Sequence, residues 1–574
     1  NMNNIPRPEH PTPQWERKNW INLNGEWEFD FDFGRSARDR KLYESDEPLS
    51  RTITVPFCPE SELSGIGYID FIPAVCYRRK FNINESQLSG RVNLHFGAVD
   101  YKTVVFVNGK YVGYHHGGYT SFSFDITSFV NIGENTVFVS AEDDNRSGLQ
   151  ASGKQSTRHE SFGCYYTRTT GIWQTVWLEF TPKNYIKCAK YYADINGALT
   201  VIGETEGGGT LQIRSSFGGV ETGSCSIKTS GGTFTAYVKL SEIHLWKLGH
   251  GNLYNLELCF GDDVVKSYFG LREVRIDGMK FMLNDRSVFQ RMVLDQGYYP
   301  KGVYTAPTDD DLVNDIKLSL AAGFNGARLH EKVFEPRFLY HCDRLGYMVW
   351  GEYPNWGFDH SNKQATELYL DGWMESVVRD FNHPSIIGWC PFNETWNYTE
   401  HDAGNKLLSS VYKYTKLYDT TRPVIDTSGN YHSVTDIYDV HDYEQDPAVL
   451  KEHYDRLYTE GVLYDHVNEQ GRGTMQCYHG EPVFVSEYGG MRWDISGKLG
   501  WGYGTAPETK NDFVARFKGL TDALLDNPKI MGLCYTQLYD VEQELNGLYT
   551  YERKPKFDPE IFYDILSRKA AIED

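Results

Sequence analysis

The sequence lacks the closely spaced cysteine pairs that hold zinc. Its ten cysteines are scattered through 574 residues, and no two form a CxxC motif. Several stand inside apolar runs, which is typical of reduced, buried thiols rather than of a disulfide framework. We therefore expect neither a structural zinc site nor a domain that disulfide bonds stabilise.

The sequence also contains no apolar run near the roughly 18 residues that a membrane-spanning helix needs. The first residues, NMNNIP, include no basic stretch followed by an apolar one, so no signal peptide is expected. The formal net charge of -21 disfavours binding to nucleic acid or to an anionic membrane surface. These features predict a cytoplasmic protein with neither kind of partner, and they leave a homo-oligomer open.

Three familiar functional motifs are incomplete or absent. The segment GLQASGKQS, residues 148 to 156, comes near to a phosphate-binding loop, but Gln155 stands where Ser or Thr must follow Lys154. The segment HEKVF, residues 330 to 334, begins like a zinc-protease helix and lacks the second histidine, and no GxSxG serine motif is found. The sequence therefore predicts no nucleotide, no metal and no other cofactor.

Two successive segments predict β-sandwiches. Residues 1 to 182 contain short strand-like runs such as GEWEFDFDF and RVNLHFGAV, separated by turns such as Asn108-Gly109, which is typical of a jelly roll. Residues 183 to 275 contain further strand-like runs between glycine-rich turns, which suits an immunoglobulin-like sandwich. Aromatic residues make up 15% of the chain, and we expect most to fill such cores and some to form platforms for sugars.

From residue 276 to 574 apolar strands alternate with amphipathic helices. Between residues 308 and 323, for example, Thr308 can cap a helix, the following aspartates favour its N-terminal dipole, and Gly323 can end it. Eight such strand-helix units predict a C-terminal (β/α)8 TIM barrel. The alternative, a doubly wound open sheet, would need a glycine-rich nucleotide loop after its first strand, which the sequence lacks. The eight expected strands are SVFQRMVLD, FNGARLH, YMVWGE, SIIGWCPFNE, RPVIDTS, DIYDVHDY, PVFVSEY and IMGLCYTQL.

Two carboxylates end expected barrel strands, Glu394 on the fourth and Glu487 on the seventh. The carboxyl ends of barrel strands converge on one mouth, where catalysis takes place. Cleavage of a glycosidic bond needs two carboxylates there, one acting at the anomeric carbon and the other protonating the leaving oxygen. Either glutamate alone could instead be a helix cap or a rim ion pair, but the pair in an aromatic neighbourhood favours catalysis.

Longer motifs support this interpretation. They are GIWQTVWLE and VNGKYVGYHHGGYTSFSFDIT in the first domain, and FNETWN, FVSEYGG and ARLHEKVFEPRFLYHCDRLGYMVWGE in the barrel. On these motifs the chain resembles glycoside hydrolase family 2, the family of β-galactosidases, β-glucuronidases and β-mannosidases, over nearly its whole length and in the same domain order. The resemblance implies that Glu394 is the general acid/base and Glu487 the nucleophile.

Further site residues follow from the resemblance and from the pKa values that the two catalytic roles require. Asn393 would hold the sugar 2-hydroxyl, and Trp389 and Trp396 would give Glu394 the apolar surroundings that raise its pKa. Three more residues belong to this set. The charge of Arg328 would keep Glu487 ionised, or Arg328 would form a structural ion pair with Glu352, and the two contacts are compatible. Tyr443 would donate a hydrogen bond to Glu487.

The chain departs from the family at three places. Asp295 stands where many members carry a histidine after the first barrel strand, and Tyr535 or Thr536 stands where relatives place a Trp. The family's β-glucuronidases grip the sugar carboxylate with an Asn-x-Lys pair, and here Glu544 and Asn546 occupy those positions. A glutamate with no lysine to compensate would repel a uronic acid.

We therefore expect a retaining exo-β-glycosidase that hydrolyses terminal neutral sugars, most of all β-galactoside-like ones, through a glycosyl-enzyme. Asp295, Glu352 and His441 would contact the hydroxyls of this carbohydrate substrate. One alternative is a β-glucuronidase or other uronidase of the same family. Another is a non-catalytic carbohydrate-binding protein with a dead site, which the intact carboxylates disfavour. A third, two adhesion sandwiches with a passenger barrel, is disfavoured by the lack of a signal peptide.

Overall fold

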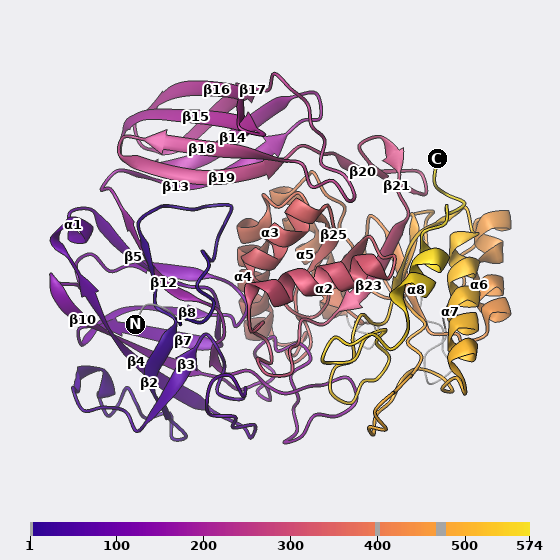
Figure 1. The fold of residues 1–574 in the computed structure, drawn as a ribbon, viewed down its shortest axis with the longest axis horizontal. Coiled ribbons are helices and arrows are strands. Elements are labelled where there is room, and N and C mark those ends of the chain that lie inside the picture. The colour runs from indigo at the N-terminus through magenta and orange to yellow at the C-terminus, as the bar shows by residue number, and fades with distance from the viewer. Residues whose placement is uncertain (1–3, 396–401, 467–477) are drawn as a thin grey trace.

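The structure is a computed structural model that describes residues 4–395, 402–466 and 478–574. Three bodies are visible in Figure 1: a first β-sandwich that carries the N-terminus, a second sandwich above it, and a barrel that ends at the C-terminus. Each body has its own apolar core. The order of the three bodies along the chain is as predicted.

The first sandwich consists of two main antiparallel sheets, with strand orders β1-β12-β5-β9 and β3-β2-β4-β10-β7-β8. Buried and half-buried residues alternate along β5, so that Val92, Leu94 and Phe96 face the core between the sheets. The strands are β1 Trp20–Asn22, β2 Gly25–Phe31, β3 Arg51–Val55, β4 Ala74–Ile83, β5 Arg91–Phe96, β7 Lys102–Val107, β8 Lys110–His116, β9 Phe122–Asp125, β10 Gly133–Glu142 and β12 Val176–Thr181. A short pair, β6 Val99–Asp100 and β11 Gly171–Ile172, lies beside them.

The second sandwich packs a three-stranded sheet, β13-β14-β17, against a four-stranded sheet, β16-β15-β18-β19. Leu211 and Ile213 of β15 are buried between exposed neighbours, the alternation expected of strands with one wet face. The strands are β13 Tyr185–Ala193, β14 Ala198–Glu206, β15 Gly209–Phe217, β16 Val220–Thr229, β17 Gly232–Lys239, β18 Leu253–Phe260 and β19 Asp263–Gly270. A small sheet of β20 Val274–Asp277, β21 Lys280–Leu283 and β22 Arg286–Ser287 follows.

The barrel is built on a parallel sheet of order β26-β25-β24-β23-β31-β30-β29, and a two-stranded parallel pair, β27-β28, supplies the remaining position. The strands are β23 Gln290–Asp295, β24 Gly326–Leu329, β25 Met348–Glu352, β26 Ile386–Cys390, β27 Phe392–Asn393, β28 Thr427–Ser428, β29 Tyr438–Asp442, β30 Val483–Tyr488 and β31 Ile530–Tyr535. All eight expected strands therefore form at the predicted places, with the fourth divided into β26 and β27.

Seven helices surround these strands in the described part of the chain, and Figure 1 shows them on the outside of the barrel. They are α2 Asp309–Ala321, α3 Pro336–Leu345, α4 Lys363–Asp380, α5 Asp402–Tyr418, α6 Pro447–Glu460, α7 Lys510–Leu525 and α8 Pro559–Leu566. The start of α2 is as predicted, because the Thr308 side chain accepts a hydrogen bond from the Asp311 backbone. Gly323, at φ +96°, follows the helix.

The prediction of eight strand-helix units is wrong at the fifth unit. Residues 429–437 connect β28 to β29 and contain no helix. Gly429 and Asn430 both have positive φ and turn the chain. The buried Asp426 carboxylate then accepts hydrogen bonds from the backbone of Ser433 and from the His432 ring. In this loop, hydrogen bonds to the Asp426 carboxylate take the place of helical ones.

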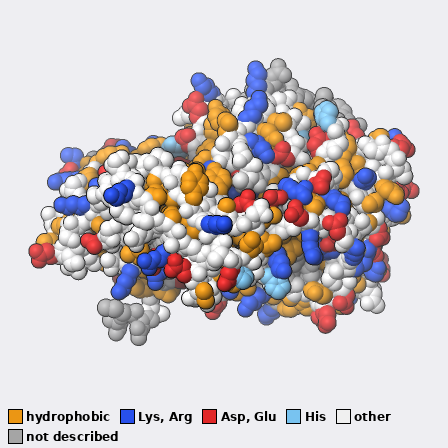
Figure 2. All heavy atoms as spheres, turned by 90° about the horizontal axis from the view of Figure 1, so that it is seen from above, with side chains coloured by type: hydrophobic (Ala, Val, Ile, Leu, Met, Phe, Trp, Pro, Cys, Tyr) orange, Lys and Arg blue, Asp and Glu red, His pale blue; other side chains and the backbone are white. Residues whose placement is uncertain are grey.

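Among the described helices, none has the length and apolar character needed to cross a bilayer. Basic and acidic side chains are interspersed over the face of the molecule seen in Figure 2. The net negative charge is therefore not gathered into one patch on that face.

The second sandwich is joined to the barrel by a buried carboxylate, Asp343 of α3. One Asp343 oxygen lies 2.6 Å from the Tyr268 hydroxyl of β19 and 2.6 Å from His383 Nδ1, and the other accepts from the Ser385 backbone at 3.0 Å. The Trp246 indole donates to the Asp343 carbonyl at 2.7 Å. Since these groups are buried, their shortest hydrogen bonds across the junction all depend on this one residue.

We expect Asp343→Ala to destabilise the junction by about 3 kcal/mol, because it leaves buried donors on two domains without an acceptor. The midpoint of urea unfolding, followed by tryptophan fluorescence, measures this effect. Asp564→Ala removes an exposed carboxylate from α8 and serves as the control, with an expected change within about 0.5 kcal/mol. Equal midpoints for the two variants would contradict this role for Asp343.

Candidate active site

The two predicted catalytic glutamates meet at the mouth of the barrel. Glu394 directly follows β27, and Glu487 lies near the end of β30. One oxygen of each carboxylate and one nitrogen of His441 all lie within 4.8 Å of one another. Retaining glycosidases hold their two carboxyl groups about 5 to 5.5 Å apart, whereas inverting enzymes leave room for a water. The observed approach fits the retaining arrangement.

Glu394 adopts an unusual backbone conformation, with φ +56°. Its backbone N–H donates to the Ser428 carbonyl of β28 at 2.8 Å, which fixes the turn at the end of the fourth strand. Non-glycine residues in this region of φ/ψ space are uncommon and cluster at functional sites. The strand ending thus aims the Glu394 side chain into the mouth.

Burial and the negative charge of Glu487 together raise the pKa of Glu394 to about 8, against smaller opposing effects from Lys154, Asn393 and Arg328. Glu394 is therefore protonated at neutral pH, as a general acid must be.

The Trp389 part of the sequence prediction is wrong, because its ring packs against Trp373 and its indole donates to Asp419 in the barrel wall. Trp396 lies outside the described residues.

Glu487 has the opposite environment. Arg328 Nη1 donates to one carboxylate oxygen at 3.0 Å, and the Tyr443 hydroxyl donates to the other at 2.5 Å. Burial alone would raise the pKa of Glu487, but the neighbouring His441, Arg328 and Lys154 outweigh it and lower the pKa below its usual value. Burial lowers the pKa of His441 itself to about 4, so the permanent charge of Arg328 dominates at neutral pH.

Arg328 makes both of the predicted contacts at once. Besides Glu487, it binds Glu352 through two hydrogen bonds of 2.8 and 3.1 Å, and it donates to the Asn393 amide oxygen at 3.2 Å. His330 Nδ1 lies 3.1 Å from the same Glu352 carboxylate. Glu352 is therefore engaged with Arg328 and His330, and burial raises its pKa to about 7.

Asn393 is held rigidly in place. Its backbone N–H donates to the Asn355 side chain at 2.9 Å, and its carbonyl accepts from the Asn355 amide at 3.1 Å and from the Trp356 indole at 3.2 Å. The side-chain oxygen of Asn393 accepts a hydrogen bond from Arg328, and its side-chain nitrogen lies 3.3 Å from a Glu394 oxygen. The donor group of Asn393 is thus fixed beside the acid/base, where the resemblance places the sugar 2-hydroxyl.

His441 lies between the two catalytic carboxylates, with Nε2 at 3.1 Å from Glu487 and Nδ1 at 3.7 Å from Glu394. Three such groups could hold a metal ion. However, both oxygens of Glu487 already accept hydrogen bonds from Arg328 and Tyr443, so a cation would have to compete with a guanidinium. The donor set fits an acid/base pair better than a metal centre.

The predicted substrate residue Asp295 does not join this cluster. Its carboxylate accepts from the Tyr539 hydroxyl at 2.6 Å and from the Gly297 backbone at 2.9 Å. In the described part of the chain it makes no hydrogen bond or ion pair with Glu394 or Glu487. Burial raises its pKa to about 6, and its hydrogen bonds are those of a structural residue at the end of β23.

Glu544 does lie at the site, buried, with its carboxylate accepting from the Tyr166 hydroxyl at 2.8 Å. Burial raises its pKa, and the charge of Lys154 opposes this rise. The eighth strand also contributes, because the Thr536 hydroxyl lies 2.9 Å from that of Tyr443, whereas Tyr535 points its hydroxyl to the Asn546 carbonyl at 3.3 Å. A lysine that the sequence analysis did not expect therefore acts on Glu544 through its charge, although no ion pair joins the two side chains among the described residues.

Sequence reasoning missed a wall of the site that the first sandwich supplies. Lys154, Tyr165 and Tyr166 come from that domain, while Trp356 and Tyr503 come from barrel loops; the Tyr503 ring stacks on Tyr443 at 3.5 Å between centroids. The only signal in the sequence was the near match to a phosphate loop around Lys154, and it indicated the wrong chemistry. The other residues of this wall could not be predicted, because they are far apart in the chain and belong to different domains.

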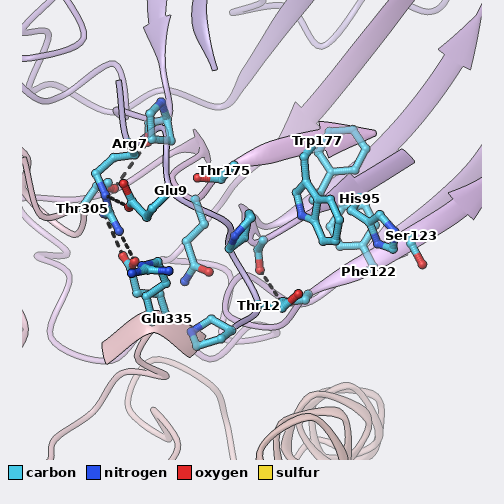
Figure 3. A pocket seen from close by; sticks show the side chains of 18 residues that line it. Arg7, Glu9, Thr12, His95, Phe122, Ser123, Thr175, Trp177, Thr305 and Glu335 are labelled. Atoms are coloured by element: carbon cyan, nitrogen blue, oxygen red, sulfur yellow. Dashed lines mark hydrogen bonds and ion pairs between the residues drawn. The ribbon is translucent and has the colours of Figure 1, made fainter. Parts of the chain in front are cut away.

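A separate cavity of about 150 Å³ lies where the first sandwich meets the barrel (Figure 3). Arg7 and Glu335 form an ion pair on one side of it, with Arg7 Nη1 3.1 Å from a Glu335 oxygen, and Trp177 and His95 line the other side. It shares no lining residue with the cluster around Glu394 and Glu487. The ion pair and the small volume indicate a domain junction.

Comparisons with known proteins agree with this geometry. Residues 21–182 match the sugar binding domain of glycosyl hydrolases family 2, and residues 274–501 match the TIM barrel domain of that family. A β-galactosidase of Thermoanaerobacter pseudethanolicus is 28% identical over 373 residues, which are 60% of this chain and 47% of that protein. A β-glucuronidase of Paenibacillus borealis is 25% identical over 518 residues, 81% of this chain and 82% of that protein.

Among solved structures, the β-glucuronidase of Lactobacillus rhamnosus superposes with a TM-score of 0.79 at 21% identity, covering 97% of this chain and 99% of the other. The chain spans about half the length of several of the curated relatives that it matches. The order of domains, the paired glutamates and the matches to both domains lead to one conclusion: the chain belongs to glycoside hydrolase family 2.

Proposed function

We propose that the chain is a retaining exo-β-glycosidase that works by double displacement. The observation that carries this proposal is the pairing of a protonated Glu394 with an ionised Glu487, with carboxylate oxygens within 4.8 Å of one another. Two carboxyl groups whose environments drive their pKa values apart can divide the roles of acid and nucleophile. The first-sandwich segment that carries Lys154 and Tyr166 walls the mouth, which favours a terminal sugar over an internal one.

In the first step Glu487 attacks the anomeric carbon while the bond to the leaving oxygen breaks, and the Glu394 proton moves to that oxygen. A covalent glycosyl-Glu487 ester and a free alcohol result. Arg328 and Tyr443 hold the Glu487 carboxylate and prevent it from turning away, with hydrogen bonds of 3.0 and 2.5 Å.

In the second step Glu394, now ionised, takes a proton from a water that attacks the anomeric carbon. The ester bond breaks, Glu487 leaves as a carboxylate, and Glu394 is protonated again. Two inversions at one carbon give net retention. Asn393 donates toward the position beside Glu394, where a hydrogen bond to the sugar 2-hydroxyl strengthens as positive charge develops on the ring.

Two classes of sugar remain candidates. A neutral β-galactoside-like substrate is supported by the curated β-galactosidases and by Glu544, whose carboxylate disfavours an acidic sugar. A uronide is supported by β-glucuronidases whose structures align with nearly the whole chain, and by a lysine beside Glu544. The coverage and the lysine together favour the uronide over the neutral sugar that the sequence had suggested.

We expect Glu487→Gln to lower kcat by about four orders of magnitude on every substrate, because the covalent route is lost. Glu394→Gln should lower it most, by about 10² to 10⁴, for leaving groups that need a proton, and much less for nitrophenyl glycosides. Azide should partly restore Glu394→Ala by attacking the glycosyl-enzyme and forming a glycosyl azide. Steady-state kinetics with both kinds of substrate measure these effects. Equal, unrescued losses in both variants would mean that the roles are assigned wrongly.

We expect the first product released to have the same anomeric configuration as the substrate. The close approach of Glu394 and Glu487 leaves no room for a water on the nucleophile side. Proton NMR recorded within the first minutes of hydrolysis, before mutarotation, distinguishes the two anomers. An initial product of inverted configuration would exclude the double displacement.

The pH dependence follows from the two pKa shifts. Glu394 acts in its protonated form, so kcat/KM should fall as the pH rises through about 8. Glu487 acts in its ionised form, so activity should persist below the usual pKa of a glutamate on the acid side. A profile from pH 3.5 to 10 with an alkyl glycoside tests both limbs. Glu394→Gln should remove the basic limb, and a basic limb that survives in this variant would assign it to another group.

A further inference from the structure

A loop of the first sandwich crosses to the barrel mouth and is fixed there. The backbone N–H groups of Ser152 and Gly153 donate to the Trp356 carbonyl at 2.9 and 3.0 Å. Gly153 has φ +60°, and a Cβ at this position would lie 2.5 Å from the Glu331 carbonyl oxygen. Only glycine permits this close approach between the loop and the barrel.

The residue after Lys154 anchors the other side of the loop. The Gln155 amide donates to Asp100 at 2.9 Å and to the Tyr119 hydroxyl at 3.0 Å, and its oxygen accepts from the Thr169 backbone at 2.9 Å. All of these groups belong to the first sandwich. Because both neighbours of Lys154 are fixed, the base of its side chain is fixed as well.

Lys154 lies between two walls of the active site. Its Nζ is 5.3 Å from the centre of the Trp356 ring, and the Trp356 indole donates to the Asn393 carbonyl at 3.2 Å. On the other side, the Lys154 carbonyl accepts from the Tyr166 backbone at 2.7 Å, and the Tyr166 hydroxyl donates to Glu544 at 2.8 Å. The lysine thus connects the Asn393–Glu394 wall to the Glu544 wall.

Apart from the Trp356 ring, the Lys154 ammonium has no partner among the described residues that carries a negative charge within ion-pair distance. The residue is 6% exposed, yet among the described residues no carboxylate oxygen lies within 4.0 Å of Nζ and no hydrogen bond leaves it. A buried charge is costly unless it is paired. The charge of Lys154 acts against burial to lower the pKa values of Glu331, Glu394, Glu487 and Glu544, but none of these carboxylates forms an ion pair with the ammonium in the described part of the chain. Glu487 is instead paired with Arg328 at 3.0 Å.

The depth of Lys154 indicates which part of a ligand would meet it. The Glu394 side chain, which must reach the leaving oxygen, is 25% exposed. Lys154, at 6%, is more deeply enclosed. A leaving group extends from the acid/base toward solvent, whereas the terminal sugar fills the enclosed part of the mouth. An anion that reaches Lys154 therefore belongs to the terminal sugar.

We propose that Lys154 is a specificity-determining residue that binds the carboxylate of a β-linked hexuronic acid in the terminal sugar position. This inference rests on the proposed glycosidase function and names its substrate class. The ammonium pairs with the sugar carboxylate in the Michaelis complex, and a neutral hexose leaves the ammonium unpaired. The selectivity of the site thus comes from the first sandwich, whereas its chemistry comes from the barrel.

The test compares the intact chain with Lys154→Met, Lys154→Gln and Lys154→Arg on five nitrophenyl glycosides. These are the β-D-glucuronide, β-D-galacturonide, β-D-glucoside, β-D-galactoside and α-L-arabinopyranoside. We expect Met and Gln to lower kcat/KM for the preferred uronide about thirtyfold or more and to change the neutral substrates less than about threefold. Arg should restore part of the uronide activity, and free D-glucuronate should inhibit the unaltered protein and Lys154→Arg more strongly than Lys154→Gln.

Lys110→Gln, which removes an exposed lysine of β8 in the same domain, is the matched control and should leave all five rates unchanged. Equal losses on uronides and neutral sugars, or no loss on uronides, would overturn the role of Lys154 while leaving the glycosidase in place. Failure of the unaltered protein to cleave any of the five would instead overturn the proposed function. Melting temperatures of the variants separate a loss of folding from a loss of selectivity, and Lys154→Arg keeps the test informative if the neutral variants unfold.

Discussion

The active site depends on one buried cation, the guanidinium of Arg328. It contacts Glu352, Glu487 and Asn393 with four hydrogen bonds of 2.8 to 3.2 Å, and so connects the ends of the second, third, fourth and seventh barrel strands. Only a planar, permanently charged group can satisfy these carboxylates together in a dry environment. The ionised nucleophile and the orientation of Asn393 both follow from this contact.

The asymmetry between the two glutamates follows from this contact, since Arg328 forms an ion pair with Glu487 and no lysine or arginine of the described residues forms one with Glu394. The charge of Arg328 keeps Glu487 ionised, so Glu394 faces a negative charge. The rise in the pKa of Glu394 on burial is not cancelled by a cation in contact with it. The same pair of residue types therefore becomes an acid and a nucleophile because of where the cation lies. His441, neutral at the working pH, sits between them without disturbing that division.

The sequence predicted the architecture and the central residues well, because both depend on local signals. Strand periodicity placed all eight barrel strands, and glutamates at strand ends indicated Glu394 and Glu487. Sequence reasoning failed where contacts join segments that are far apart in the chain. The Asp295 carboxylate accepts a hydrogen bond from Tyr539, 244 residues further on, and among the described residues it makes no hydrogen bond or ion pair with Glu394 or Glu487. Lys154 belongs to the first sandwich but lies at the active site of the barrel. Sequence reasoning also gave the fifth unit a helix that side-chain hydrogen bonds replace.

The close approach at Gly153 has a consequence for how such a protein can diversify. The contact with the Glu331 carbonyl fixes the spacing between a sandwich loop and the barrel rim, so any variant of this loop has to keep a glycine at position 153. Substitutions at Lys154 can therefore alter which sugars enter while the bond-breaking residues stay untouched. Tyr119, Tyr166 and Trp173 of the first sandwich also belong to the apolar cluster of the barrel, so the two domains form one structural unit around the site.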